Sequence, residues 1–207
     1  MPEFLFIADQ LWLDFVNTQI APAESPAELL QTPADLVAWL HAAGVPGNAA
    51  QKRMLQKAHG PSGEQWLKQA LEFRSALRSL AVALSSDAAV PPNAPKAINQ
   101  VLLESRSTQS VRKSRSGFEL TEDREPSSLL GLLAPVAQSA AEFLVSGKFD
   151  RIRKCGNPAC ILYIYDTTRS HTRQWCSMAT CGNRMKVAAF YRRRHSRSSR
   201  SEELAKE

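Results

Sequence analysis

Residues 155–160 read CGNPAC and residues 176–183 read CSMATCGN, and these two stretches contain all four cysteines of the 207-residue chain. Within each stretch the cysteines follow the spacing C-x4-C, and fifteen residues separate the two pairs. A tetrahedral metal ion needs two close pairs joined by a short connector, because each pair binds the ion from one side while the connector folds back. The spacing therefore predicts a metal site.

Zinc is the metal that fits this spacing best. It accepts four thiolates at about 2.3 Å and can hold together a segment too small to bury a core of its own. Two disulfides would need an oxidising compartment, an iron–sulfur cluster usually has more closely set cysteines, and free thiols would not be expected to cluster in this way. We predict one structural zinc ion bound by Cys155, Cys160, Cys176 and Cys181.

The tripeptide Cys-Gly-Asn occurs twice, at residues 155–157 and 181–183. Glycine and asparagine adopt a positive φ more readily than other residues, and this conformation can turn backbone N–H groups toward a sulfur. We therefore expect Gly156, Gly182 or the asparagines to serve the metal site in this way.

Residues 175–184, WCSMATCGNR, together with the first cysteine pair and Asp166–Arg169, resemble the CGNR zinc finger family. Members of that family usually carry an N-terminal ABATE-type domain and are regarded as stress-related transcription regulators. Residues 11–18, LWLDFVNT, followed by residues 33–36 and 39–40, are similar to the start of that domain. The resemblance implies an ABATE-like domain over residues 1–150, a finger over 151–195 and a tail over 196–207.

Charge is distributed unevenly along the chain. Residues 151–207 carry 13 Lys/Arg against 4 Asp/Glu, a net charge of +9, whereas residues 1–150 carry 13 against 16, a net charge of −3. A mildly acidic body with a strongly basic end is typical of a protein whose end binds a polyanion. The alternative is a solvated basic tail that only aids solubility.

The N-terminal part is predicted to be mostly helical. We expect a short strand at 4–7, a helix from about residue 10 capped by Asp9, and a helix that opens at Thr32 and ends at Gly44. Further helices are expected after Asn48 and over 63–85, 95–105 and 126–146, with a β-hairpin over 107–123. The fold class is thus α+β: a mostly helical domain with a small β-hairpin, followed by the finger.

Asp14, Asn17 and Thr18 are polar residues in an apolar stretch. They could line a ligand site, or they could satisfy neighbouring backbone groups, and we favour the second role. In the regulator hypothesis the N-terminal domain receives a signal, which is a small ligand or a partner.

In the finger we expect strands at 151–154 and 161–165, a turn at 166–172 and a helix that begins near Cys176. This order suggests a treble-clef-like, four-cysteine zinc finger. Val187, Phe190 and Tyr191 could face the finger core, while Lys186, Arg193 and Arg197 share an outer face. We expect residues 196–201 to be disordered until bound. The candidate nucleic-acid contacts are Arg173, Arg184, Lys186, Arg192, Arg193, Arg194 and Arg197.

We expect a cytoplasmic DNA-binding regulator rather than an enzyme. The four histidines lie outside any recognisable nucleophile or phosphate-binding motif, and a zinc ion with four thiolates leaves no position for a substrate water. The chain lacks an apolar run long enough to span a membrane and a basic region typical of a signal peptide. RNA or an acidic protein surface is the alternative partner, and a homodimer is left open.

Overall fold

The computed structural model describes residues 3–21, 27–45 and 47–192. The α-helices are α1 (Leu11–Val16), α2 (Pro33–Ala42), α3 (Ala49–Leu55), α4 (Gly60–Ser85), α5 (Asn93–Leu103) and α6 (Ala134–Ser146), and residues 183–192 are also helical. The strands are β1 (Gln19–Ile20), β2 (Ala27–Glu28), β3 (Ser105–Ser114), β4 (Gly117–Pro126), β5 (Ile152–Lys154) and β6 (Tyr163–Tyr165). Short 3-10 turns cover Leu130–Leu133 and Phe149–Arg151, and a π-helical turn covers Met178–Gly182.

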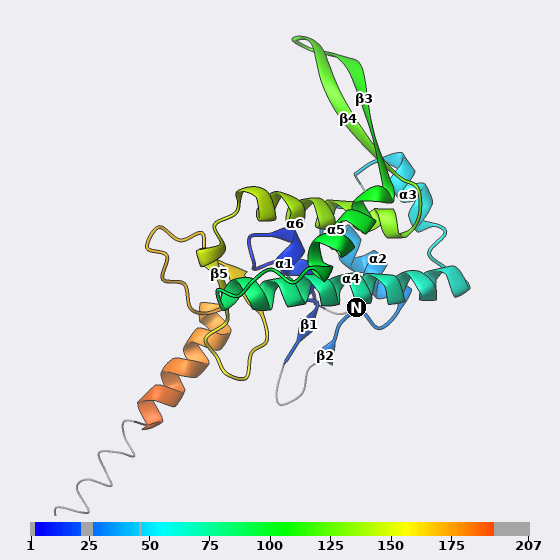
Figure 1. The fold of residues 1–207 in the computed structure, drawn as a ribbon. Coiled ribbons are helices and arrows are strands. Elements are labelled where there is room, and N and C mark those ends of the chain that lie inside the picture. The colour runs from blue at the N-terminus through cyan, green and yellow to red at the C-terminus, as the bar shows by residue number, and fades with distance from the viewer. Residues whose placement is uncertain (1–2, 22–26, 46, 193–207) are drawn as a thin grey trace, which may run out of the picture.

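Helix α4 is the centre of the N-terminal domain and crosses its full width (Figure 1). Its apolar residues recur every three or four positions, so they form one stripe that packs against α1, α2 and α5. Trp66, Trp12 and Trp39 are fully buried in the resulting core. The expected helical domain with a small hairpin is therefore confirmed.

The starts of α2 and α3 follow their local sequence signals. Thr32 accepts a hydrogen bond from the Asp35 amide while the Asp35 side chain accepts one from the Thr32 amide, and Asn48 and Gln51 form the same reciprocal pair. Such capping boxes satisfy amides that have no partner inside the helix. Gly44, just past α2, has a φ of +71°.

Two expectations for the first twenty residues were wrong. Residues 4–7 form no strand, and Gln10 rather than Asp9 is the residue that precedes α1. Asp9 instead adopts a positive φ of 56° and turns its carboxylate toward the C-terminal part of the chain. Hydrogen bonds from Asp9 to residues more than 150 positions later in the sequence thus replace the expected helix cap.

Strands β3 and β4 form a long antiparallel hairpin that stands away from the helical body (Figure 1). Its register pairs Ser105 with Pro126 at the base and Ser114 with Gly117 at the tip. The hairpin meets the body at its base, through α3, α5 and the turn at Leu130–Leu133. It is longer than the sequence pattern predicted.

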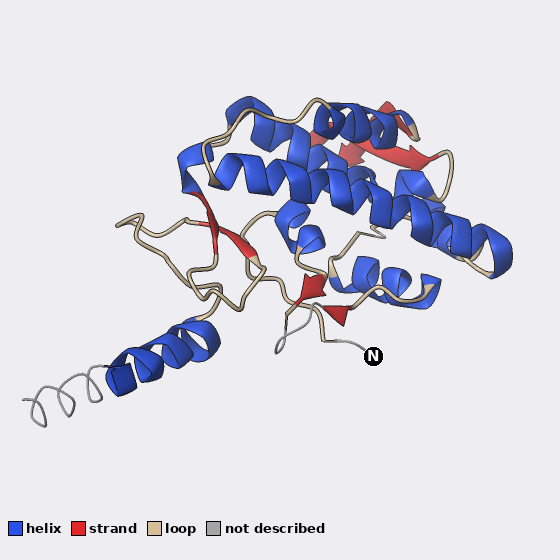
Figure 2. Cartoon of the chain, turned by 60° about the horizontal axis from the view of Figure 1, so that its bottom comes forward, coloured by secondary structure: helices blue, strands red, loops and turns tan. Residues whose placement is uncertain are grey.

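The C-terminal part lies toward the end of α4 opposite the hairpin (Figure 1 and Figure 2). Strands β5 and β6 pair antiparallel, with Ile152 opposite Tyr165, and Ile152 and Tyr163 belong to the same core as the tryptophans. Within the described part of the chain, none of the helices has the length and hydropathy needed to cross a membrane.

Candidate metal centre and nucleic-acid interface

The two cysteine pairs are presented by different structures. Strand β5 leads directly into Cys155, and a tight turn carries the chain through Cys160 to β6. The second pair lies at the start of the C-terminal helix, with Cys181 inside the π-helical turn that continues into residues 183–192. A turn between two strands facing the start of a helix is the arrangement expected for a treble-clef-like finger.

The four sulfur atoms converge on one point. All four cysteines are buried, and their Sγ atoms lie within 4.8 Å of one another. The Cys160 and Cys176 Sγ atoms are 3.9 Å apart. Four sulfurs at zinc–thiolate distance from a common centre would be separated by about 3.8 Å, so the cluster has the size and the donor set for one structural zinc ion.

The protonation of the thiols depends on their neighbours. Hydrogen bonds from Cys160 and Cys176 lower the pKa of the Cys155 thiol, whereas the same hydrogen bonds raise the pKa values of Cys160 and Cys176. The site can therefore hold one thiolate readily, but Cys160 and Cys176 resist ionisation, first because they hydrogen-bond to the Cys155 thiolate and then because they are buried. A divalent cation removes that resistance, which is why this cluster suits zinc.

Hydrogen bonds to two of the sulfurs come from the opposite cysteine pair. The Asn157 side-chain Nδ2 donates to Cys181 Sγ at 3.3 Å, and the Cys176 amide donates to Cys155 Sγ at 3.4 Å. Asn183, the asparagine of the second Cys-Gly-Asn tripeptide, does not bind a sulfur in this way. Its Nδ2 donates to the Ala179 carbonyl instead.

The expected positive φ at Gly156 and Gly182 was wrong, because neither glycine has it. Their role is to make space for Trp175. A Cβ added at Gly156 would lie 3.0 Å from the Trp175 ring, and one added at Gly182 would lie 3.1 Å from the ring and 2.5 Å from Met178 Sδ. Both glycines thus lie against the same indole.

With this centre in place, two family models match the chain. Residues 9–147 match ABATE, described as "Putative stress-induced transcription regulator", and residues 151–194 match the CGNR zinc finger. The chain belongs to the ABATE family. The resemblance seen in the sequence is confirmed at both ends of the chain. No curated protein shows significant similarity to it.

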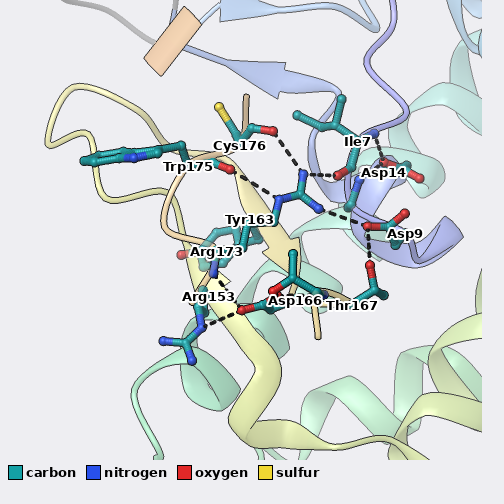
Figure 3. Close-up of polar contacts among 12 residues, drawn as sticks. Ile7, Asp9, Asp14, Arg153, Tyr163, Asp166, Thr167, Arg173, Trp175 and Cys176 are labelled. Atoms are coloured by element: carbon teal, nitrogen blue, oxygen red, sulfur yellow. Dashed lines mark hydrogen bonds and ion pairs between the residues drawn. The ribbon is translucent and has the colours of Figure 1, made fainter. Parts of the chain in front are cut away.

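Arg173 joins the CGNR finger to the ABATE domain. Its guanidinium donates to the Asp9 carboxylate at 2.9 Å and to the Ile7 carbonyl at 2.8 Å, and also to the carbonyls of Trp175 and Cys176 (Figure 3). The sequence suggested Arg173 as a nucleic-acid contact. The structure places it between the two domains, with four of its donors engaged.

Asp166 organises the loop before the second cysteine pair. Its fully buried carboxylate accepts hydrogen bonds from the Thr168 hydroxyl and amide and from the Arg173 amide, and Arg153 Nε lies 3.7 Å away. Burial alone would raise the pKa of Asp166, but these hydrogen bonds outweigh it and lower the pKa below its usual value. The carboxylate therefore stays ionised and fixes the loop.

Asn17 forms a reciprocal hydrogen-bond pair across the same junction. Its side chain donates to the Tyr163 carbonyl at 2.8 Å and accepts from the Tyr163 amide at 2.9 Å. Asn17 thereby pairs with the backbone amide and carbonyl of Tyr163 in β6, as a neighbouring strand would. Neighbouring Thr18 donates to the Phe15 carbonyl and accepts from Arg74, which also pairs with Glu28.

Asp14 holds the segment that the finger contacts. Its carboxylate accepts hydrogen bonds from the Ile7 and Ala8 amides, both at 2.9 Å, while the Ala8 carbonyl accepts one from the Tyr165 amide. Burial raises the pKa of Asp14 to about 6, with the two amides acting against the shift. All three members of the Asp14, Asn17 and Thr18 cluster thus bind protein groups.

Arg78 of α4 was not singled out from the sequence. Its guanidinium donates to the carbonyls of Val16, Gln19 and Ile161, and it lies over the Tyr163 ring at 5.9 Å. The regular apolar stripe of α4 gives no sign of this role, which depends on chain segments distant in sequence.

The helix over residues 183–192 projects from the CGNR finger away from the rest of the molecule (Figure 1). Arg184, Lys186 and Arg192 are exposed on it. The expectation that Val187, Phe190 and Tyr191 face the finger core was wrong, because each is more than half exposed. Arg193, Arg194, Arg197 and the tail over 196–207 lie outside the described residues.

An open cavity of about 570 Å³ lies beside the metal centre. Its walls come from Ile7 of the N-terminal segment and from Thr168, Ser170 and residues 172–178. The cavity adjoins the base of the projecting helix, so hydroxyl, aromatic and basic groups are gathered at this end of the molecule.

Proposed function

We propose that the protein is a DNA-binding transcription regulator whose CGNR finger presents the C-terminal helix to DNA phosphates. The observation that carries this proposal is the exposed basic helix over residues 183–192, which begins two residues after the zinc ligand Cys181. Zinc fixes the start of the helix, so its basic side chains approach a partner from a rigid base. In this proposal the metal is structural and the protein is not an enzyme.

Charge supports a polyanionic partner. Residues 151–192 contain eight basic residues and one acidic residue, and that acidic residue, Asp166, is fully buried. A surface with such a charge attracts nucleic acid, and binding releases the counterions that are condensed on the phosphates. Arginine forks suit phosphate oxygens and guanine edges equally, so phosphate contacts provide affinity and a smaller number of base contacts provide sequence preference.

In this proposal the ABATE domain receives the regulatory signal. It holds the finger through Asn17, Arg78 and Arg173, so a change in the domain reaches the finger through these hydrogen bonds. The signal is a small ligand or a protein partner.

The test is titration of labelled duplex DNA at several salt concentrations. The logarithm of affinity should fall linearly with the logarithm of salt, with a slope of about 0.9 for each phosphate contacted. Replacing Arg192, Arg193 and Arg194 by Ala should flatten the slope by up to about three units on every sequence alike. Lys186→Ala should instead alter the preference between sequences if the helix enters a groove.

The matched control removes the same charge elsewhere. Arg106, Arg112 and Arg115 lie on the β3–β4 hairpin, and their replacement by Ala should leave the slope close to that of the wild type. If the wild type fails to bind duplex at low salt, or if both triple variants change the slope equally, the proposal fails. Binding of single-stranded RNA or of an acidic protein in place of duplex would support the alternative partner class.

A further inference from the structure

The C-terminal helix over residues 183–192 has an exposed apolar ridge. Val187, Phe190 and Tyr191 form this ridge, and they are 54, 54 and 55% exposed. Because they are three and four positions apart, they lie on one side of the helix. The Phe190 and Tyr191 rings meet edge to face, with their centroids 5.8 Å apart. Apolar side chains gathered in this way on a surface usually mark a contact site.

Basic side chains flank the ridge on both sides. Successive residues of an α-helix are about 100° apart around its axis, so Arg184 lies about 70° to one side of the centre of the ridge and Lys186 about 90° to the other. Both side chains are exposed, and residues 183–192 contain no acidic residue. Arg192 lies nearly opposite the ridge and is not part of this face. The partner is therefore expected to have an apolar strip between two negatively charged edges.

The size and charge of the ridge argue against a second protein chain. Aromatic side chains bury about 150–250 Å² each, so two half-exposed rings and a valine offer roughly 300 Å². Stable protein interfaces bury about 800 Å² per partner. A second copy of this helix is disfavoured further, because its basic flanks would face the basic flanks of the first.

The major groove of duplex DNA has the matching shape and charge. It is about 12 Å wide and admits an α-helix about 10–12 Å in diameter, whereas the minor groove, about 6 Å wide, is too narrow. Phosphates follow both edges of the groove, as the basic residues follow both sides of the ridge. The helix projects from the CGNR finger away from the rest of the molecule, so it is accessible to a duplex (Figure 1).

The floor of the groove determines which bases suit the ridge. Base edges there are polar apart from the C5-methyl group of thymine. Apolar side chains packed on the polar edges would remove water from donors and acceptors without replacing their hydrogen bonds, which is unfavourable. Packed on thymine methyl groups, the same side chains bury apolar surface on both partners. The ridge therefore favours A·T pairs through an apolar contact.

We propose that the C-terminal helix enters the major groove with Val187, Phe190 and Tyr191 against thymine methyl groups and with Arg184 and Lys186 toward the two edges of the groove. This inference rests on the proposed DNA binding and adds the groove, the face of the helix and the base that it selects. Phosphate contacts place the helix on any sequence, and the methyl contacts choose among sequences.

The test compares duplexes that differ only in methyl groups. The zinc-loaded full chain is titrated with a labelled A·T-rich duplex and with the same duplex containing deoxyuridine in place of every thymidine. Loss of one methyl contact should weaken binding about three- to fourfold, and loss of several should weaken it about tenfold or more. 5-Methylcytosine in place of cytosine should strengthen binding to a G·C-rich duplex. This comparison uses the wild type alone, so it does not depend on the folding of any variant.

Variants then show whether the ridge makes the discrimination. Val187→Asn combined with Phe190→Gln and Tyr191→Gln should bind the thymidine and deoxyuridine duplexes equally, with the salt slope of the wild type because the basic groups remain. Val145→Asn is the matched control, since Val145 on α6 is 89% exposed and lies outside the finger. The control should keep the discrimination of the wild type. Metal analysis should show one zinc ion in each variant.

The outcomes separate this inference from the proposed function. A wild type that binds the thymidine and deoxyuridine duplexes equally overturns the inference and leaves the proposed DNA binding intact. Discrimination that persists in the triple variant, or that is lost equally in Val145→Asn, also overturns it. A wild type that binds neither duplex at low salt overturns the proposed function together with the inference. Binding to anionic vesicles or to an acidic protein that the triple variant loses, without a preference for thymidine, identifies a different partner and overturns it too.

Discussion

The ABATE domain and the CGNR finger are held together by different means. The ABATE domain buries a continuous core of aliphatic and aromatic side chains around α4. In the finger, the buried cluster consists of the four cysteines with Leu162 and Ile164. A segment with so little apolar material depends on its metal, whereas the helical domain depends on burial of apolar surface. The difference predicts which perturbation each part resists.

Loss of zinc should have the largest effect. Cys176→Ser should abolish binding of one zinc ion and unfold the finger, because structural zinc contributes on the order of 10 kcal/mol to folding of such sites. Metal analysis and circular dichroism measure the result, with Ser177→Ala as the control that keeps its zinc. The helices of the ABATE domain should persist. Their collapse in the same transition would show that the two parts form one cooperative unit.

Removal of the reciprocal hydrogen bonds at Asn17 should come next. Asn17→Ala leaves the Tyr163 amide and carbonyl without partners at a buried site, which should cost about 2–4 kcal/mol of unfolding free energy. Asn99→Ala, at an exposed position on α5, is the matched control. Denaturant titration compares the two variants. Equal midpoints would mean that the junction adds little to the stability of either part.

Arg173 should affect stability rather than DNA affinity. Arg173→Ala removes hydrogen bonds to Asp9 and Ile7, and we expect a loss of about 1–3 kcal/mol with an unchanged salt slope for DNA binding. The exposed neighbour Arg169 supplies the control, since Arg169→Ala should keep wild-type stability within about 0.5 kcal/mol. A reduced slope with full stability would restore Arg173 to the nucleic-acid contacts.

Asp14 should have the smallest effect, and one that depends on pH. Its folded pKa of about 6 is higher than the unfolded value of 3.8, so the folded state binds the proton more tightly and stability falls as pH rises from about 4 to 6. Asp14→Asn keeps an oxygen for the Ile7 and Ala8 amides without the charge. Because the carboxyl group keeps some solvent contact, we expect a gain of about 1–2 kcal/mol at pH 8.

The comparison for Asp14 is between pH 4 and pH 8. At pH 4 the wild-type carboxyl group is largely protonated when folded, so the wild type and Asp14→Asn should unfold at similar denaturant concentrations. Asp35→Asn, in an exposed capping box, should show no such gain at high pH. A loss of stability in Asp14→Asn at pH 8 would mean that the negative charge itself is needed beside Arg173.

The features that were predicted correctly from the sequence are those determined by residues close together in the chain. The cysteine pairs, the capped starts of α2 and α3, and the β-hairpin are each specified by residues close together in the sequence. The long-range hydrogen bonds of Asn17, Arg78 and Arg173 join residues 59 to 166 positions apart, and a single sequence carries no periodic signal for them. The locally plausible cap at Asp9 failed for the same reason.

The C-terminal helix shows a different limit. Its apolar residues have the spacing of a buried stripe, yet Val187, Phe190 and Tyr191 are exposed. Periodicity identifies the face of a helix but not whether another element covers it. Likewise, the repeated glycines could be recognised as special from the sequence, but the contact with Trp175 needed the structure.

The contacts between the two ends of the chain also impose an order on synthesis. Leu5, Ile7 and Ile20 pack against the cysteine cluster, and Ala8 binds Tyr165. A ribosome makes these residues first, while their partners emerge some 150 residues later, so the N-terminal segment waits with apolar groups in water. Such long-range contacts form slowly, because the chain must lose the entropy of closing the loop before the contacts stabilise it. We therefore expect the docking of the finger onto residues 5–20 to come late in folding.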